Sequence, residues 1–189
     1  MVANFVWRSK EYTSLENCRA TITHAGVNVS SVIIGVTDDK IFEVEYNLKI
    51  NSHWETESVE IKSTIEGLVQ SFSFQSNAKG SWQRNGELLP QFNDCIDVDL
   101  PLTPFTNTLP INRLKLEHHQ QQLIKVVYLD LLSYEMKPVT QKYTRLSDSS
   151  YKYENVPNDF EAVIRVDDLG FVVDYPTLFE RIARRDNSM

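Results

Sequence analysis

Residues 41–50 read Ile-Phe-Glu-Val-Glu-Tyr-Asn-Leu-Lys-Ile, and this stretch decides the class of fold. From Phe42 to Ile50 every second residue is apolar, and each residue between is charged or an amide. A period of two places the apolar side chains on one side of an extended chain, whereas an α-helix needs a period of about 3.6. The stretch therefore predicts a β-strand with one buried side and one side facing solvent.

Other segments repeat this alternation. It occurs at Val59 and Ile61, over residues 96–100, and over residues 160–166. Residues 123–132 and 171–173 are apolar without a clean period; we interpret both as strands covered on two sides, with a short buried helix as the alternative. Turn-forming residues separate these runs at 37–40, 77–80, 85–86, 147–150 and 167–170. The pattern predicts many antiparallel hairpins.

One helix is predicted, at the C-terminus. Leu178, Phe179, Ile182 and Ala183 follow Pro176 at helical spacing, and proline is tolerated in a first helical turn. Three arginines, Arg181, Arg184 and Arg185, would then complement the negative end of that helix. We expect a mainly β single domain over residues 1–189, in which a large curved antiparallel sheet, a half-barrel or barrel, is wrapped around a single C-terminal α-helix.

Composition narrows the class of partner. Nineteen Lys and Arg residues against 26 Asp and Glu give a net charge of −7, the wrong sign for binding nucleic acid or an anionic membrane surface. No stretch approaches the roughly 18 apolar residues of a membrane span, and the first residues do not resemble a secretory signal. We therefore expect a cytoplasmic protein without stable membrane insertion. Cys18 and Cys95 are expected to be buried, inert thiols.

The segment from Asp94 to Leu114 departs from simple strand patterning. Asp97 and Asp99 are two residues apart, so a strand places both on one face with α-carbons about 7 Å apart. They form either a solvated edge or a carboxylate pair at the wall of a pocket. Three prolines follow, at positions 101, 104 and 110, and disfavour ladder pairing. Between them Thr103, Thr106, Asn107 and Thr108 either tie a rigid loop to itself or offer hydrogen bonds to a ligand.

The same segment carries a family resemblance. The runs Cys95-Ile96-Asp97-Val98-Asp99 and Thr103-Pro104-Phe105-Thr106-Asn107-Thr108-Leu109-Pro110-Ile111, with Arg113-Leu114, resemble the signature of the putative glycolipid-binding family. The similarity continues through Gln141, Tyr143, Tyr151, Tyr153, Phe160, Val166-Asp167, Gly170 and the ending Val173-Asp174-Tyr175-Pro176. Upstream it rests on Trp7-Arg8, Gly35, Tyr46, Trp54, Gly80 and Trp82, so it covers nearly the whole chain.

The resemblance implies a many-stranded antiparallel sheet around one helix, remotely like bacterial lipoprotein-localisation carriers, with an acidic pocket, a tight homodimer, a bacterial origin and a proposed role in glycolipid metabolism. The sequence departs from the family pattern at Asp94, where a glycine is usual, and at Asn112, where an arginine pair is usual. Glu55 and Glu57 stand where the family tends to carry basic residues. These departures make the predicted site more acidic and argue against an anionic head group.

Candidate ligand-binding residues follow from what a sugar requires, namely aromatic faces beside carboxylate or amide groups. The candidates are Asp97, Asp99, Arg113, Thr106, Asn107, Trp54, Tyr143, Asp167 and Asp174. Trp7, Trp82 and Tyr175 are further aromatic candidates, although core packing is the alternative for every aromatic residue. Asp167 could instead stabilise a hairpin turn, and Asp174 the start of the C-terminal helix. Arg113 could clamp one member of the acidic pair and keep it ionised.

Three hypotheses for function remain. The first is a non-enzymatic binding protein for a glycolipid or related amphipathic saccharide, acting as a homodimer. The second is a hydrolase that acts on glycosides through Asp97 or Asp99 and another carboxylate. The third is a structural or interaction protein without a ligand. No catalytic residue, cofactor or metal site is predicted, because no nucleotide-binding, hydrolase or metal-ligand motif occurs.

Overall fold

The computed structural model describes residues 1–157 and 159–187, and within them the chain forms one continuous fifteen-stranded sheet. In chain order the strands are β1 (Val2–Ser9), β2 (Ser14–Thr23), β3 (Gly26–Thr37), β4 (Lys40–Asn51), β5 (Thr56–Ile65), β6 (Leu68–Ser76), β7 (Trp82–Arg84), β8 (Glu87–Leu88), β9 (Cys95–Asp99), β10 (Gln121–Leu129), β11 (Met136–Ser147), β12 (Ser150–Val156), β13 (Glu161–Val166), β14 (Val172–Tyr175) and β15 (Phe179–Asn187). The alternating stretch around Tyr46 is β4, as its period predicts.

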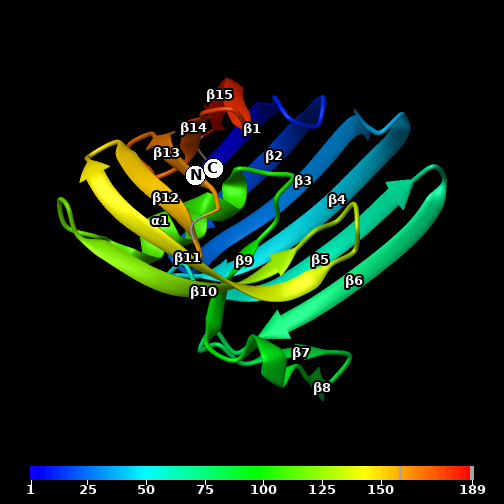
Figure 1. The fold of residues 1–189 in the computed structure, drawn as a ribbon, viewed down its shortest axis with the longest axis horizontal. Helices are drawn as coiled ribbons and strands as arrows, with labels where there is room; N and C mark the ends of the chain where they lie inside the picture. Colours follow the sequence, from blue (N-terminus) through cyan, green and yellow to red (C-terminus); the bar gives the residue numbers. More distant parts are fainter. Residues whose placement is uncertain (158, 188–189) are drawn as a thin grey trace.

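The two ends of the chain meet in the middle of the sheet. The strand order is β8-β7-β6-β5-β4-β3-β2-β1-β15-β14-β13-β12-β11-β10-β9, so β1 pairs with β15 and the outer edges are β8 and β9. The described pairs are antiparallel except that β9 runs parallel to β10. The sheet is open and bends around a short helix, α1 (Thr108–Leu114), on its concave side (Figure 1). The prediction of a curved, mainly β sheet around a single helix is confirmed.

The position of the predicted helix is wrong. Residues after Pro176 turn at Thr177 and continue as β15, because β1 offers them a full antiparallel partner from Ser9 to Val2. Arg181 and Arg184 therefore lie on a strand rather than near a helix end. The spacing of Leu178, Phe179 and Ile182 is compatible with either element over so few residues, and pairing with β1 decides between them.

The helix lies instead in the proline-rich segment, where the 3-10 turn η2 (Phe105–Asn107) leads into α1. Pro104 precedes η2, and Pro110 is the third residue of α1. Backbone N–H groups in a first turn have no partner within the helix, so proline costs little there. Leu109 and Ile111 are buried against the sheet. A second 3-10 turn, η1 (Pro90–Phe92), precedes β9.

Two apolar clusters fill the concave side. The larger cluster contains alternate residues of β1 to β5, with Phe5, Trp7 and Phe42 at most 1% exposed. The indole N–H of Trp7 donates to the Val172 carbonyl at 3.0 Å, and that of Trp82 to the Cys95 carbonyl at 2.6 Å. Core packing, the alternative for both tryptophans, is therefore what the structure shows. Cys18 and Cys95 are buried and unbridged, as predicted.

The smaller cluster underlies the C-terminal half of the sheet. It contains the tyrosines of β11, β12 and β14, namely Tyr143, Tyr151, Tyr153 and Tyr175, together with Ile111 of the helix. Within the described residues, no helix combines the length and apolar character needed to cross a bilayer.

Candidate functional site

The two acids of β9 have different environments. Asp97 is completely buried, and its two oxygens accept hydrogen bonds from Nε and Nη2 of Arg113 at 3.1 and 2.5 Å. Burial raises the pKa of Asp97, the Arg113 guanidinium opposes that rise, and the nearby Glu55 carboxylate adds to it. The expected ion pair between Arg113 and one buried acid is present. Because Arg113 binds both oxygens of Asp97, this acid has a structural role and is not presented to a ligand.

Asp99 is partly buried and has no cationic partner among the described residues. Its Oδ2 accepts a hydrogen bond from the Gln141 side-chain amide at 2.7 Å, and its Oδ1 accepts one from the Thr106 hydroxyl at 3.3 Å. Burial raises the pKa of Asp99 to about 6, and these two hydrogen bonds counteract part of that rise. Asp99 thus remains available to a ligand, because an ionised carboxylate accepts about four hydrogen bonds.

Asp99 lines a cleft of about 630 Å³. The cleft is formed by the β1–β2 turn, the loop after β9, one end of β10, β11 and β12, and the β14–β15 turn. Its lining residues are Glu11, Tyr12, Asp99, Pro101, Thr103, Asn107, Tyr128, Lys137, Pro138, Val139, Thr140, Tyr153, Asn155, Val156, Pro157, Asp159, Phe160, Tyr175, Leu178 and Phe179. Its volume lies within the range of about 300–1,000 Å³ that is usual for sites of small ligands.

Aromatic rings gather on one side of this cleft. The ring centroids of Tyr153 and Tyr175 are 6.1 Å apart, and Phe160 lies 6.1 Å from Tyr153 and 6.3 Å from Tyr175. Burial, and then the charge of Asp99, raise the pKa of both tyrosines, so their hydroxyls stay protonated, and that of Tyr153 donates to the Asn155 side-chain oxygen at 2.5 Å. Tyr143 lies behind this cluster, 1% exposed, and its hydroxyl accepts from the Asn107 amide at 2.9 Å.

The structure brings together some of the predicted residues and separates others. Asp99 and Asn107 line the cleft, while Thr106 and Tyr143 contact those two side chains from behind. Trp54 is in the β4–β5 connection at φ 64°, where its ring packs edge-on against Phe171. Trp54 does not line the cleft.

Asp167 and Asp174 also lie outside the cleft. Asp167 accepts hydrogen bonds from the backbone N–H groups of Leu169 and Phe171, which confirms its expected turn role, and pairs with Arg181 and Arg184 at 2.5 and 2.6 Å. Asp174 faces Lys10 and Arg165, each at 3.4 Å. Strands, and no helix, follow Asp174 up to residue 187, so its suggested role at a helix start is wrong.

Sequence reasoning missed most of the cleft wall. Glu11, Tyr12, Tyr128, Lys137 and Asp159 come from four distant parts of the chain and carry no motif. Gln141 could have been found from the alternation of β11, because it is a polar residue at an inward-facing position of that strand. It is only 2% exposed. Within residues 1–157 and 159–187, no group of three or more His, Cys, Asp and Glu side chains is arranged to hold a metal ion.

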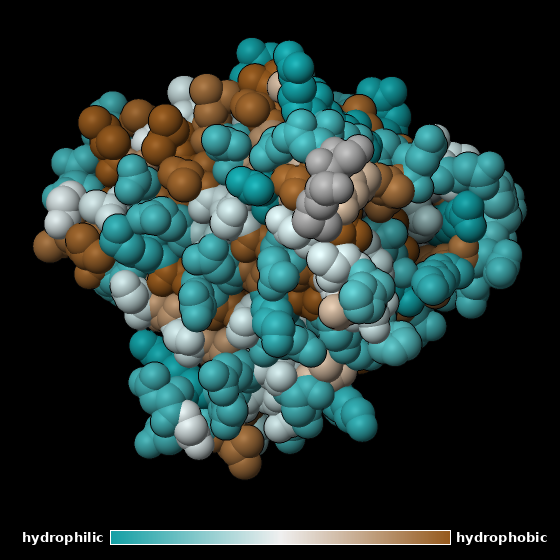
Figure 2. Space-filling model, turned by 180° about the vertical axis from the view of Figure 1, so that it is seen from behind, coloured by the Kyte–Doolittle hydropathy of each residue, from teal (hydrophilic) through white to brown (hydrophobic). Residues whose placement is uncertain are grey.

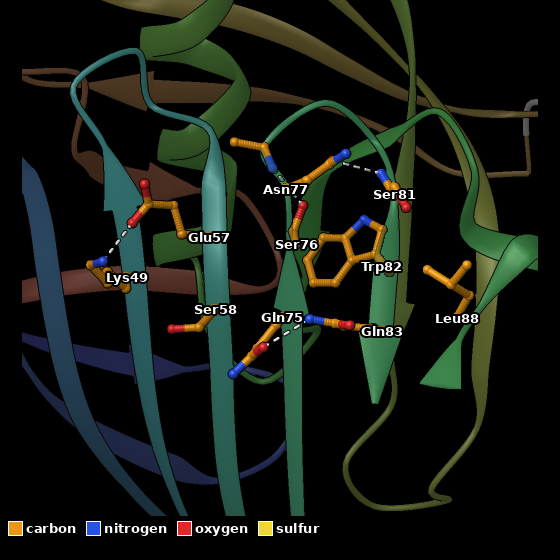
Figure 3. Close-up of a pocket in the computed structure, with 11 residues that line it drawn as sticks. Lys49, Glu57, Ser58, Gln75, Ser76, Asn77, Ser81, Trp82, Gln83 and Leu88 are labelled. Atoms are coloured by element: carbon orange, nitrogen blue, oxygen red, sulfur yellow. Dashed lines mark hydrogen bonds and ion pairs between the residues drawn. The ribbon is translucent and has the colours of Figure 1, made fainter. Parts of the chain in front are cut away.

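A second hollow, of about 720 Å³, lies where β4 to β8 adjoin (Figure 3). Its wall contains an ion pair between Lys49 and Glu57 at 2.8 Å and a hydrogen bond from the Gln83 amide to Gln75 at 2.9 Å. Of the candidate ligand-binding residues that the structure describes, Trp82 alone lines this hollow, and its indole N–H is already bound to the Cys95 carbonyl. We take the cleft beside Asp99 as the candidate site because it combines aromatic rings with carboxylates.

Comparison with known proteins agrees with this architecture. A crystal structure of a DUF1089 family protein from Pseudomonas aeruginosa superposes with a TM-score of 0.84 at 33% sequence identity, covering 93% of this chain and 95% of that one. A search among curated proteins finds no match. The family model described as "Putative glycolipid-binding" matches residues 4–181. The chain therefore belongs to the putative glycolipid-binding family.

Proposed function

We propose that this protein binds a glycolipid or a related amphipathic saccharide in the cleft beside Asp99, without catalysing a reaction on it. The observation that carries the proposal is the composition of the cleft wall. Tyr153, Phe160 and Tyr175 supply ring surface for the apolar side of a sugar, and Asp99 and Asn107 supply acceptors and donors for its hydroxyls. The family description supports the same class of ligand.

An apolar part of the wall suits an alkyl or acyl chain. Val139, Val156, Leu178 and Phe179 line the cleft together with Pro138 and Pro157. Each buried methylene contributes about 0.8 kcal/mol to binding, so a short chain adds more affinity than a few sugar hydrogen bonds that replace bonds to water. A sugar without a chain is therefore expected to bind weakly, and an alkyl glycoside is the appropriate probe.

Blocking the cleft tests this proposal. Val139→Trp places an indole in the cleft wall, and we expect the affinity for octyl β-D-glucopyranoside, measured by titration calorimetry below its micelle concentration, to fall at least about tenfold. Val163→Trp is the matched control, because Val163 is 42% exposed on β13 and does not line the cleft. Equal loss of binding in both variants, or no binding by the parent protein, contradicts the proposal.

A glycoside hydrolase is the second candidate, favoured by one observation. Asp99, whose pKa burial raises to about 6, shares the cleft with the carboxylates of Glu11 and Asp159. A carboxyl group with a raised pKa beside a second carboxylate is the arrangement that glycoside hydrolysis uses. Release of free sugar from the same octyl glucoside, abolished in Asp99→Asn, would favour this candidate over simple binding.

We also propose that the protein is a cytoplasmic homodimer that associates through the outer face of β2, β3 and β4. Five apolar side chains on that face are 41% to 68% exposed: Leu15, Val32, Ile34, Val36 and Ile41. Leu15 faces Ile34 across one strand pair and Val36 faces Ile41 across the next, so the side chains form one patch. Figure 2 shows brown surface gathered at the upper left, over these strands. Clustered exposed apolar side chains mark interaction sites, and two copies of one such patch can pack together across a two-fold axis.

A charge in this patch is expected to separate the dimer. Ile34→Lys should convert a species of twice the 21.9 kDa chain mass into one of the chain mass, because an ammonium would lose its hydration at the interface. Light scattering coupled to size exclusion measures the change. Val163→Lys, an exposed valine on a different part of the sheet, should leave the mass unchanged. A parent protein with the mass of one chain at all concentrations would refute the dimer.

A further inference from the structure

Three carboxylates in the cleft lack a basic partner. Glu11, Asp99 and Asp159 all line the cleft, and within the described residues no Lys, Arg or His nitrogen lies within 4.0 Å of their oxygens. Asp97, by contrast, is paired with Arg113, and Asp167 with two arginines. The described residues therefore supply no ion-pair partner for these three carboxylates in the cleft.

The basic residue that lines the cleft is already neutralised. Among the described lining residues Lys137 is the one lysine or arginine, and its ammonium lies 3.1 Å from both carboxylate oxygens of Glu135. It also lies 5.5 Å from the centre of the Tyr128 ring. Because Glu135 and Tyr128 hold this charge at the rim, Lys137 offers little attraction to an anionic ligand.

The aromatic cluster, like the carboxylates, favours a positively charged ligand. An aromatic ring carries negative potential on its face, and Tyr153, Phe160 and Tyr175 all line the cleft, with ring centroids 6.1 to 6.3 Å apart. Asp99 lies close enough for its charge to act on both tyrosines. Aromatic faces beside a carboxylate are the arrangement that proteins use to bind ammonium groups.

We propose that the head group recognised in this cleft carries a positive charge, such as the protonated amine of an amino sugar, and that Asp99 and Glu11 select for that charge. This inference rests on the proposed binding function and names the class of its ligand. A neutral sugar would gain the stacking contacts but leave the carboxylates without a counter-charge, and an anionic head group would be repelled by them.

Three probes with the same alkyl chain test the inference. They are octyl 2-amino-2-deoxy-β-D-glucopyranoside, its N-acetyl derivative and octyl β-D-glucopyranoside, titrated by calorimetry at pH 7 below their micelle concentrations. We expect the free amine to bind at least about tenfold more tightly than the two neutral probes, which corresponds to about 1.4 kcal/mol. The preference should shrink in 1 M salt, where charge attraction is screened within about 3 Å.

Variants assign the preference to the cleft. Asp99→Asn and Glu11→Gln should each lower the ratio of the affinity for the free amine to the affinity for octyl glucoside; Glu11 is exposed, so its variant tests the idea even where Asp99→Asn folds poorly. Asp168→Asn removes an exposed charge outside the cleft and should change nothing. Equal affinity for all three probes, or a preference that persists in both cleft variants, overturns this inference while the binding function stands. Failure of all three probes to bind overturns both.

Discussion

Replacing Arg113 by leucine is expected to reduce the free energy of unfolding by about 3–5 kcal/mol, which is the usual cost of leaving one member of a buried ion pair unpaired. Asp97 is 0% exposed, and Arg113 makes both of its side-chain hydrogen bonds. Without the guanidinium, the carboxylate is left ionised in an apolar environment or must take up a proton. Urea unfolding at pH 7 measures the loss.

The same variant has a distinctive pH dependence. Removal of Arg113 removes the influence that lowers the pKa of Asp97, so the pKa of Asp97 in the folded state rises further above its ordinary value of 3.8. The folded state then holds a proton that the unfolded chain releases, and stability falls as the pH rises through that window. We therefore expect acid to restore part of the stability of Arg113→Leu.

A second substitution separates the ion pair from simple packing. Asp97→Asn combined with Arg113→Leu should recover most of the loss, because no charge is then left buried. Arg185→Leu is the control, since Arg185 is exposed on β15. A double variant no more stable than Arg113→Leu alone would show that the arginine acts through its packing and not through Asp97.

The sequence predicted the parts of the fold that depend on local pattern. Alternation located β4, β5, β9 and β13, and turn residues located hairpins such as the one at Asn85-Gly86 between β7 and β8. The pattern misplaced the helix, because a short stretch such as Phe179 to Ala183 fits both the helical period and the strand period. Pairing with β1, at the other end of the chain, makes this stretch a strand. Proline in α1 indicated correctly that the segment is not a strand, but a first helical turn tolerates proline as well as a loop does.

The candidate site likewise contains one part that the local sequence pattern predicts and another part that it does not. Asp97 and Arg113 are sixteen residues apart, on β9 and α1, and their partnership was predictable. Asp99 lies 42 residues from Gln141, its strongest hydrogen-bond partner. That contact depends on β9 joining the sheet beside β10, in a parallel pairing that no local pattern indicates. A cleft assembled from turns and strand ends far apart in the chain has no sequence signature of its own.

A buried acid outside the cleft, Glu16 of β2, was also not predicted. It is 3% exposed, and its Oε1 accepts hydrogen bonds from the Tyr46 hydroxyl at 2.6 Å and the Ser31 hydroxyl at 2.7 Å. Its Oε2 is buried and has no hydrogen-bond partner in the described part of the chain. The Tyr46 hydroxyl also lies 3.2 Å from that of Thr103, in the loop that lines the cleft. Burial raises the pKa of Glu16 from 4.5 to about 7, although the hydroxyls of Tyr46, Thr103 and Ser31 oppose the rise.

Glu16→Gln is therefore expected to make the protein more stable at alkaline pH. Between pH 4.5 and about 7 the folded protein keeps a proton on Glu16 that the unfolded chain has lost, so stability falls as the pH rises through this window and stays low above it. At about 1.4 kcal/mol per pKa unit, the parent protein loses about 3 kcal/mol from this group. Glutamine does not ionise and keeps a carbonyl acceptor for Tyr46 and Ser31, while its amide nitrogen takes the place of Oε2, which is buried without a hydrogen-bond partner among the described residues, at a cost of about 1 kcal/mol.

The expected result is a crossing of two stability curves. In urea unfolding at pH 5, 6, 7 and 8, Glu16→Gln should be slightly less stable than the parent at pH 5 and about 2 kcal/mol more stable at pH 8. Asp99, whose pKa is also raised, contributes equally to both proteins, so the difference between the curves isolates Glu16. Glu60→Gln, an exposed change on β5, should run parallel to the parent. A Glu16→Gln curve that is also parallel would mean that Glu16 is ionised throughout, because only a proton held by the folded state can make the two curves cross.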